Sequence, residues 1–305
     1  MGHLKMVGRI EIPHMSAAIV ACDQLILGCN LKNYQLHMYD TTTMELLGKS
    51  TTLVEPITCM CVGAEPGMLM VGMQNARIAA CKVGRSSIDV MGTFNLSHKL
   101  KTVQSMARTL RNDYVLGTQA GVCFGRWLAH EKQFEVIGVT PGANSAPLTF
   151  LAGRQTARVE ALEDDYVLAA DYNQPGYYLI NRATKDIRKL EEAITDNRGC
   201  FDLLPLPNFS LQDFPFCLAK GINGVSLLNL ATQETYEIIK TQRMQGNSFC
   251  QKLSCKRKRN IVGAHVANKL DMVVTHVEHK EGRTIVEQLD LPELFIRALS
   301  LNGHI

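Results

Sequence analysis

Three histidines near the end of the chain have side chains that could bind a metal ion. His265, His276 and His279 are close together in the sequence, but their spacing matches no zinc-site signature, and the first two fall on separate expected strands. Histidines of this kind are more often solvated or packed in a core than bound to a metal. We therefore predict neither a metal site nor a cofactor.

The sequence motifs of common catalytic sites are absent. There is no GxSxG nucleophile elbow, no phosphate-binding P-loop, no GxGxxG turn and no HExxH zinc motif. Because such motifs supply the nucleophiles, phosphate cradles and metal ligands of many enzymes, their absence favours a protein that is not an enzyme.

Lys256, Arg257, Lys258 and Arg259 form the one strongly basic cluster. One interpretation is a nuclear-localisation or phosphate-contacting patch. The other, which we favour, is a hairpin turn between two strands, where charge keeps a sheet edge soluble. The chain has 32 Lys and Arg against 29 Asp and Glu, and a net charge of +3 is too small for a protein that neutralises many phosphates. Nucleic acid is therefore not an expected partner.

The overall composition is that of a water-soluble globular protein. Hydrophobic residues make up 46% and charged residues 20% of the chain, and no apolar run approaches the ~20 residues that span a bilayer. The ten cysteines include no CxxC pair, and most lie in apolar runs, so we expect reduced core thiols. These features predict no membrane insertion and a cytoplasmic protein, with the nucleus as the alternative.

A repeat with a period of 44 to 52 residues determines the expected architecture. An apolar triplet followed by Gly or Ala recurs six times, the sixth time more weakly as Asn260-Ile261-Val262-Gly263, and the small residues are Gly28, Gly72, Gly117, Ala169, Ala219 and Gly263. A regular recurrence of this kind indicates a repeat fold. A small residue at this position fits close packing between neighbouring units.

Each repeat contains about four short strands. Further candidate strands precede the triplets, at roughly 16–22, 57–63, 103–109, 157–162, 200–204 and 248–254, and two β-rich runs follow each triplet. Long helical periodicity is missing. Four antiparallel strands per repeat are typical of a β-propeller blade, because a lone four-stranded sheet must cover both of its faces. The sequence therefore predicts an all-β propeller.

The segment from Tyr39 to Leu47, Tyr-Asp-Thr-Thr-Thr-Met-Glu-Leu-Leu, resembles the end of a WD40 repeat. Equivalent stretches begin at Ile180-Asn181 and Leu228-Asn229, and the only Trp, Trp127, is not followed by Asp. The chain is thus similar to a degenerate WD40 propeller, with the citron-homology propellers as a close alternative. Either resemblance implies a scaffold that docks proteins in signalling or trafficking assemblies.

The blade count leaves one strand over at each end of the chain. Six units fill residues 15 to 291, and Val7–Ile12 and Leu294–Leu299 remain. They could form a partial seventh blade that closes the ring and removes open sheet edges. We expect residues 1–305 to form a single propeller domain, either complete or the terminal domain of a longer chain.

Loops between the second and third strands of each unit are the expected docking surface. In propellers they lie together on one face, and aromatic and Arg side chains favour protein interfaces. The candidate partner-binding residues are Tyr34, Arg77, Gln119, Tyr172, Asn223 and Lys269. The function predicted is non-catalytic protein–protein interaction with a partner protein or a neighbouring domain. The alternative is a propeller hydrolase or lyase with its active site in a central channel.

Overall fold

The computed structural model describes residues 15–30, 33–137, 156–163, 165–171, 176–190, 200–206, 209–221, 224–240, 250–256, 261–266, 272–280 and 283–289. From residue 236 onward only the backbone is described, without the side chains. Among all the residues described there is no α-helix, and the one short helix is the 3-10 turn η1 (His98–Leu100).

The strands form six four-stranded antiparallel sheets, each in simple chain order. The first three are β1 (Met15–Ala21), β2 (Gln24–Cys29), β3 (Gln35–Asp40), β4 (Leu46–Lys49); β5 (Ile57–Val62), β6 (Met68–Met73), β7 (Arg77–Val83), β8 (Ile88–Asn95); and β9 (Val103–Arg108), β10 (Asp113–Thr118), β11 (Gly121–Leu128), β12 (Gln133–Val136). The last three are β13 (Thr156–Ala161), β14 (Tyr166–Asp171), β15 (Tyr177–Asn181), β16 (Ile187–Leu190); β17 (Cys200–Pro205), β18 (Phe216–Gly221), β19 (Gly224–Asn229), β20 (Thr235–Lys240); and β21 (Cys250–Lys256), β22 (Ile261–Val266), β23 (Met272–Lys280), β24 (Arg283–Leu289).

This arrangement confirms the all-β fold and the four-strand repeat. The first five triplets lie on the second strand of their sheets, as do Ile261 and Val262 of the sixth, whose Asn260 lies outside the described residues. Each candidate strand ahead of a triplet is a first strand. The remaining segments, Val7–Ile12 and Leu294–Leu299, lie outside the described residues. The partial seventh blade therefore stays a prediction.

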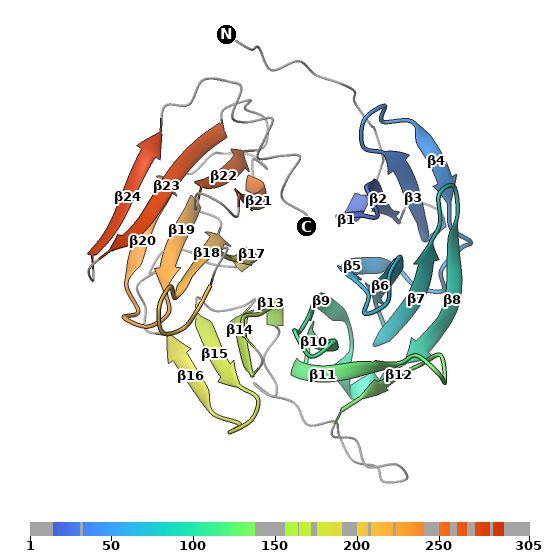
Figure 1. Cartoon of the computed structure of the whole chain (residues 1–305). Helices are drawn as coiled ribbons and strands as arrows, with labels where there is room; N and C mark the ends of the chain where they lie inside the picture. The colour runs from blue at the N-terminus through green and yellow to red at the C-terminus, as the bar shows by residue number, and fades with distance from the viewer. Residues whose placement is uncertain are drawn as a thin grey trace. The chain divides into compact units, whose positions relative to one another are not determined.

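The chain separates into two compact units, and each is described by itself. One comprises Met6–Ala169 with Ile180–Ile187, and the other comprises Met1–Lys5, Ala170–Leu179 and Arg188–Ile305. In the first unit the first strands β1, β5, β9 and β13 lie one beside the next, as Figure 1 shows. In the second unit β17 lies beside β21, and β20 beside β24.

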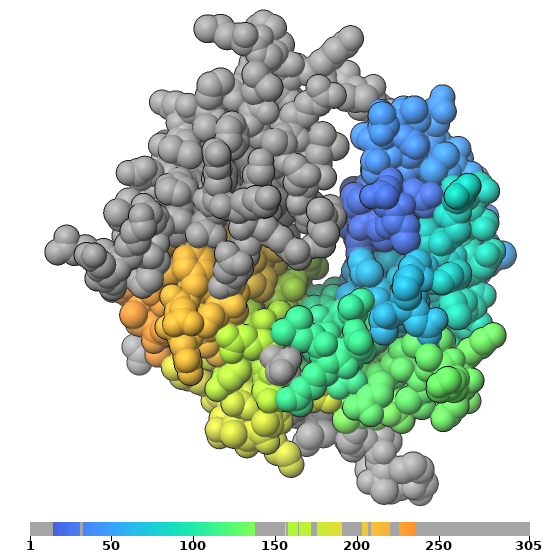
Figure 2. All heavy atoms as spheres, in the orientation of Figure 1, coloured from blue at the N-terminus to red at the C-terminus, as the bar shows by residue number. Residues whose placement is uncertain are grey.

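Two apolar cores hold the sheets of the first unit together. Leu69, Val71 and Met73 of β6 pack toward the sheet β1–β4, whereas Met68 and Met70 pack toward the sheet β9–β12. Successive side chains of a strand point to opposite faces, so a strand buried on both faces must be apolar at every position. This is why the triplets are unbroken apolar runs. Figure 2 shows these three sheets, coloured blue to green, in close contact.

The small residue after the triplet allows this close approach in three sheets. A Cβ on Gly72 would lie 2.4 Å from Sγ of Cys59 and 2.9 Å from Cγ1 of Val103 on the next sheet's first strand. In the same way, a Cβ on Gly28 would lie 3.0 Å from Cγ2 of Ile57, and a Cβ on Gly117 would lie 3.1 Å from Cγ1 of Val159. The expected close packing between neighbouring sheets is confirmed at these three positions.

The later repeats do not keep the same frame. Gly28, Gly72 and Gly117 are each the fifth residue of a second strand, whereas Ala169 and Ala219 are the fourth and Gly263 is the third. The shift of one residue at Ala169 and Ala219 moves the side chain to the opposite face of the sheet, and the shift of two residues at Gly263 moves the position along the strand on the same face. The six small residues are therefore not structurally equivalent, because an apolar strand buried on both faces leaves the frame of the pattern undetermined.

The stretch that resembles a WD40 repeat forms the same turn in three sheets. The side-chain oxygen Oδ1 of Asp40 accepts the N–H groups of Thr42 and Thr43 at 2.7 and 2.8 Å. In the same way, Oδ1 of Asn181 and Oδ1 of Asn229 each accept hydrogen bonds from the backbone N–H groups two and three residues later, at 2.9 to 3.1 Å. The N–H groups of Thr43 and Thr42 hold the pKa of Asp40 below its usual value. Asn thus replaces Asp without loss of the turn.

Candidate interaction surface

The loops expected to bind a partner lie at one end of the sheets, here called the connector face. It comprises, in the first unit, the loops between second and third strands and the connectors that lead to the next sheet (residues 50–56 and 96–102). Four main-chain hydrogen bonds join loops to connectors. The donor N–H and the acceptor carbonyl are those of Leu53 and Tyr34 at 2.7 Å, Gln74 and Pro56 at 3.1 Å, Leu96 and Ala76 at 2.8 Å, and Gln119 and Thr102 at 3.1 Å. Loops and connectors therefore form one continuous bonded rim.

Tyr34 is half-buried on this rim. Its ring packs against the core between the first two sheets, and its backbone pairs with Leu53 as an isolated bridge. The neighbouring Asn30 side chain bonds both the N–H and the carbonyl of Ile57, at 2.9 and 2.8 Å. The loop that presents Tyr34 is therefore held firmly at both of its ends.

Arg77 is also half-buried and is tied to the adjacent connector. Its Nη1 lies 3.3 Å from Oε1 of Glu55, and Nδ2 of Asn75 donates to the other oxygen of that carboxylate at 3.0 Å. The Arg77 side chain keeps 33% of its surface exposed. Glu55 therefore engages the guanidinium, while a third of the side-chain surface stays exposed to solvent.

Gln119 is half-buried on the third loop, but the other candidates cannot be placed with it. Tyr172, Asn223 and Lys269 lie outside the described residues. Of the basic cluster, Lys256 ends β21 and pairs with Ile261 at the start of β22, as expected for a hairpin. Arg257, Lys258 and Arg259 lie outside the described residues, between these two strands.

Sequence reasoning missed the connector of residues 97–102. Here η1 presents His98 and Lys99 to solvent, and Lys101 follows it, also exposed. Leu96 and Leu100 are 9% and 1% exposed and anchor the turn in the core between the second and third sheets. The signal was present as two Leu residues four apart, with basic residues between and after them.

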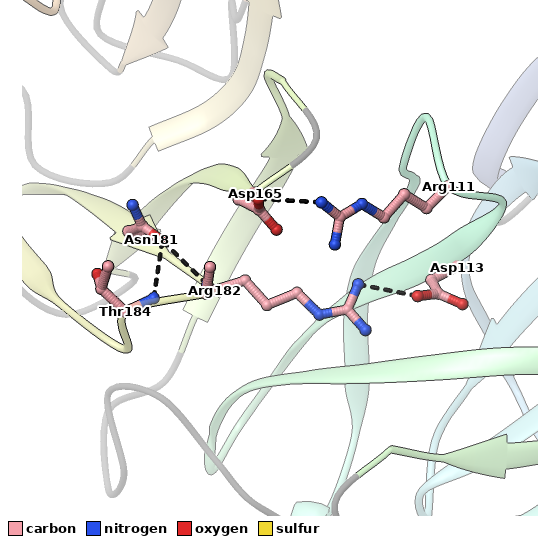
Figure 3. A network of polar contacts seen from close by, with 7 residues as sticks. Arg111, Asp113, Asp165, Asn181, Arg182 and Thr184 are labelled. Carbon is pink, nitrogen blue, oxygen red and sulfur yellow. Dashed lines mark hydrogen bonds and ion pairs between the residues drawn. The ribbon is translucent and has the colours of Figure 1, made fainter.

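The opposite ends of the strands, the hairpin face, hold a network of charged side chains (Figure 3). Asp113, at the start of β10, is bonded by Nε of Arg126 at 2.7 Å and by Nη1 of Arg182 at 2.8 Å. Arg111 pairs with Asp165 at 3.0 Å. Burial alone raises the pKa of Asp113, but hydrogen bonds and charge from both arginines outweigh it, so the pKa lies below its usual value. Both oxygens of the Asp113 carboxylate are bonded by arginines, which is the mark of a structural network, whereas Oδ1 of Asp165 is buried without a hydrogen-bond partner.

No arrangement of ligating side chains marks a metal site. Among the described residues there is no group of three or more His, Cys, Asp or Glu that could hold an ion. The register of β22 and β23 pairs His265 with Met272 and His276 with Ile261, so the two histidines lie at opposite ends of the pairing. In the described part of the chain, no helix has both the length and the apolar character needed to cross a membrane.

No protein-family model matches this sequence, and no curated protein matches it either. Solved structures do match. U3-55K is 10% identical with a TM-score of 0.66, over 92% of this chain and 82% of the other. The β-propeller domain of Cps50 (Swd1) from Myceliophteria thermophila is 12% identical with a TM-score of 0.60, over 94% and 89%. The WD40 repeats of RRP9 are 10% identical with a TM-score of 0.66, over 92% and 81%. The chain therefore has a WD40-like β-propeller fold, and identity at this level shows the fold alone.

Proposed function

We propose that this protein is a non-catalytic scaffold that docks a partner protein or a neighbouring domain through the connector face, in a cytoplasmic signalling or trafficking assembly. The observation that supports the proposal is the continuous rim of main-chain hydrogen bonds between loops and connectors. A surface that is already ordered loses little conformational entropy when a partner binds.

The side chains on this rim suit a protein partner. Tyr34 and Arg77 are half-exposed, and Val54 on the connector between them is 52% exposed. Tyr and Arg are enriched among the residues that dominate binding energy at protein interfaces. We infer that Tyr34 and Arg77 contact the partner and that Gln119 lies within the same interface.

The test is capture of proteins from cell extract on the tagged chain, with quantification of each captured protein. Tyr34→Ala with Arg77→Ala should weaken binding of a specific captured protein by at least about thirtyfold, because loss of one dominant side chain already costs about 2 kcal/mol of binding. The matched control is Leu110→Ala with Lys132→Ala, which removes an apolar and a basic side chain from the hairpin face. It should leave capture unchanged.

Thermal melting of both double variants shows whether they remain folded. If Tyr34→Ala proves destabilising, Arg77→Gln alone provides the comparison, because it leaves the Tyr34 packing intact and places no second carboxylate beside Glu55. Capture that survives the connector-face changes and is lost with the hairpin-face control would contradict the proposal. Turnover in a hydrolase or lyase screen would contradict the non-catalytic assignment.

A further inference from the structure

Residues 97–102, which lead from β8 to β9, are here called the basic connector. Its side chains at His98, Lys99 and Lys101 are exposed, while Leu100 is 1% exposed and anchors the turn. The backbone is fixed by hydrogen bonds from Leu100 to Ser97 at 2.9 Å and from Lys101 to His98 at 3.2 Å. The basic side chains are therefore displayed from a fixed support.

Lys101 has a backbone conformation that disfavours lysine. Its φ is 60° and its ψ is −115°, a region in which a side chain crowds the backbone and which glycine adopts without strain. The strained residue is exposed and makes no ion pair within the described residues. The ammonium group of Lys101 is therefore carried by an exposed side chain on a hydrogen-bonded backbone.

The basic connector is continuous with the surface described above. Arg77 pairs with Asn95 just before the connector begins, and Gln119 is bonded to Thr102 at its end. In the described loops and connectors of this unit, Glu55 is the one carboxylate, and Arg77 and Asn75 already engage it.

The other end of the same sheets has a different charge. The described hairpin-face turns carry seven carboxylates against five basic side chains, a formal net charge of −2: Asp23, Glu45, Glu65, Glu131, Glu163, Asp165 and Asp186 against Arg85, Arg111, Lys132, Arg182 and Lys185. The described loops and connectors of the connector face carry Arg77, Lys99 and Lys101 against Glu55, a formal net charge of +2. A partner that bears negative charge is therefore steered toward the connector face and away from the hairpin face.

We infer that the partner docks an acidic peptide segment on the basic connector, with its carboxylates near Lys99 and Lys101 and its flank against Arg77 and Gln119. This inference rests on the proposed function and specifies the chemistry of the partner. Few cations line the surface, and the apolar Val54 and the ring of Tyr34 lie on the same rim. Such a mixed surface suits a polypeptide better than a nucleic acid backbone, which needs many phosphate contacts.

The test uses the full chain and a phage-displayed library of random dodecapeptides as probe. Panning should enrich sequences rich in Asp and Glu. A selected peptide, labelled with fluorescein and measured by anisotropy, should bind Lys99→Glu with Lys101→Glu at least about tenfold more weakly, because each reversal turns attraction into repulsion. Binding should also weaken as salt is raised. Lys132→Glu with Lys185→Glu, on the hairpin face, is the control and should bind as the wild type does.

A second pair of variants separates charge from backbone strain. Lys101→Gly relieves the strained conformation and removes the ammonium group. It should therefore raise the melting temperature and weaken the binding of the acidic peptide. Lys132→Gly is matched, because Lys132 is also exposed and has a positive φ of 49°. It should raise the melting temperature without changing the affinity.

The outcomes distinguish this inference from the proposed function. Enrichment of neutral or apolar peptides that depend on Tyr34 and Arg77 would overturn the acidic partner and leave the docking face standing. Failure to enrich any peptide that depends on the connector face would count against both. The chain could instead bind a single-stranded oligonucleotide more tightly than any peptide and lose that binding in Lys99→Glu with Lys101→Glu. That result would overturn the inference that the partner is a polypeptide and would favour a nucleic acid.

Discussion

Arg182 reaches from the β15–β16 hairpin to Asp113 at the start of β10, where Nη1 and Oδ2 are 2.8 Å apart. The Arg182 guanidinium also lies over the ring of Phe124, 4.5 Å from its centroid, and the Arg182 N–H bonds the carbonyl of Asp165 at 2.7 Å. The side chain of Asp113 is 4% exposed. Within the first unit this pair therefore ties the sheet β9–β12 to the hairpin that follows it.

Asp113→Ala should destabilise the protein by about 3 kcal/mol, because it leaves two guanidinium groups without their shared buried carboxylate. Chemical denaturation at pH 7 measures the loss. Arg111→Ala serves as the control, since the Arg111–Asp165 pair is half-exposed and contributes less than about 1 kcal/mol. Equal losses from the two changes would show that Asp113 is not the centre of the network.

The same pair predicts a pH dependence with a definite sign. The folded-state pKa of Asp113 lies below its ordinary value, so its contribution is present above the unfolded pKa of about 3.9 and is lost as pH falls through the folded pKa. The wild type should therefore lose stability below about pH 4 more steeply than Asp113→Asn. Parallel curves for the two proteins would contradict the assignment.

Lys185→Gly should stabilise the protein by about 0.5 to 1 kcal/mol. Lys185 ends the Asn181 turn with a φ of 65°, a left-handed conformation that glycine adopts at no steric cost. Ala183→Gly, two residues earlier in the same exposed turn, is the comparison. Ala183 has no positive φ, so this change should destabilise by a similar amount, and thermal melting of both variants reveals the difference in sign.

Gly72→Ala should cost about 1 to 3 kcal/mol, because its methyl group would overlap Sγ of Cys59 and Cγ1 of Val103. Gly176→Ala is the matched control. There the nearest atom is Cε of Lys189 at 3.4 Å, an ordinary contact with a flexible side chain. Denaturation midpoints that shift equally would show that the sheets can move apart to admit a side chain.

Among the seven cysteines whose side chains the structure describes, thiol labelling should separate the exposed Cys22 from the buried six. Cys22 lies exposed on the β1–β2 turn, whereas burial raises the pKa of Cys59 to about 11 and of Cys61, Cys81 and Cys123 to about 12. Alkylation of the native protein at pH 7.5, followed by mass spectrometry of its peptides, should label Cys22 faster than Cys59, Cys81 or Cys123. Unfolding without reductant should then release ten thiols, and six or fewer would disprove the reduced state.

The sequence by itself determined the strands and their grouping, because both depend on neighbours along the chain. Burial on both faces requires the unbroken apolar run Leu69-Met70-Val71, and the short polar side chain of Asp40 caps its own turn two and three residues on. Positions such as Tyr34 and Arg77 could be assigned to one end of the sheets for the same reason.

Only the tertiary structure decided which side chains contact one another at the ends of the sheets. Asp113 and Arg182 are 69 residues apart, and nothing in either local segment predicts their pairing. The frame of Ala219 and Gly263 depends on how adjacent sheets interlock, since an all-apolar strand has no polar face to set its register. The display of Lys101 likewise depends on Leu96 and Leu100 entering a core that two neighbouring sheets build together. Contacts between distant segments form only when packing brings their sheets together, and the local pattern does not encode them.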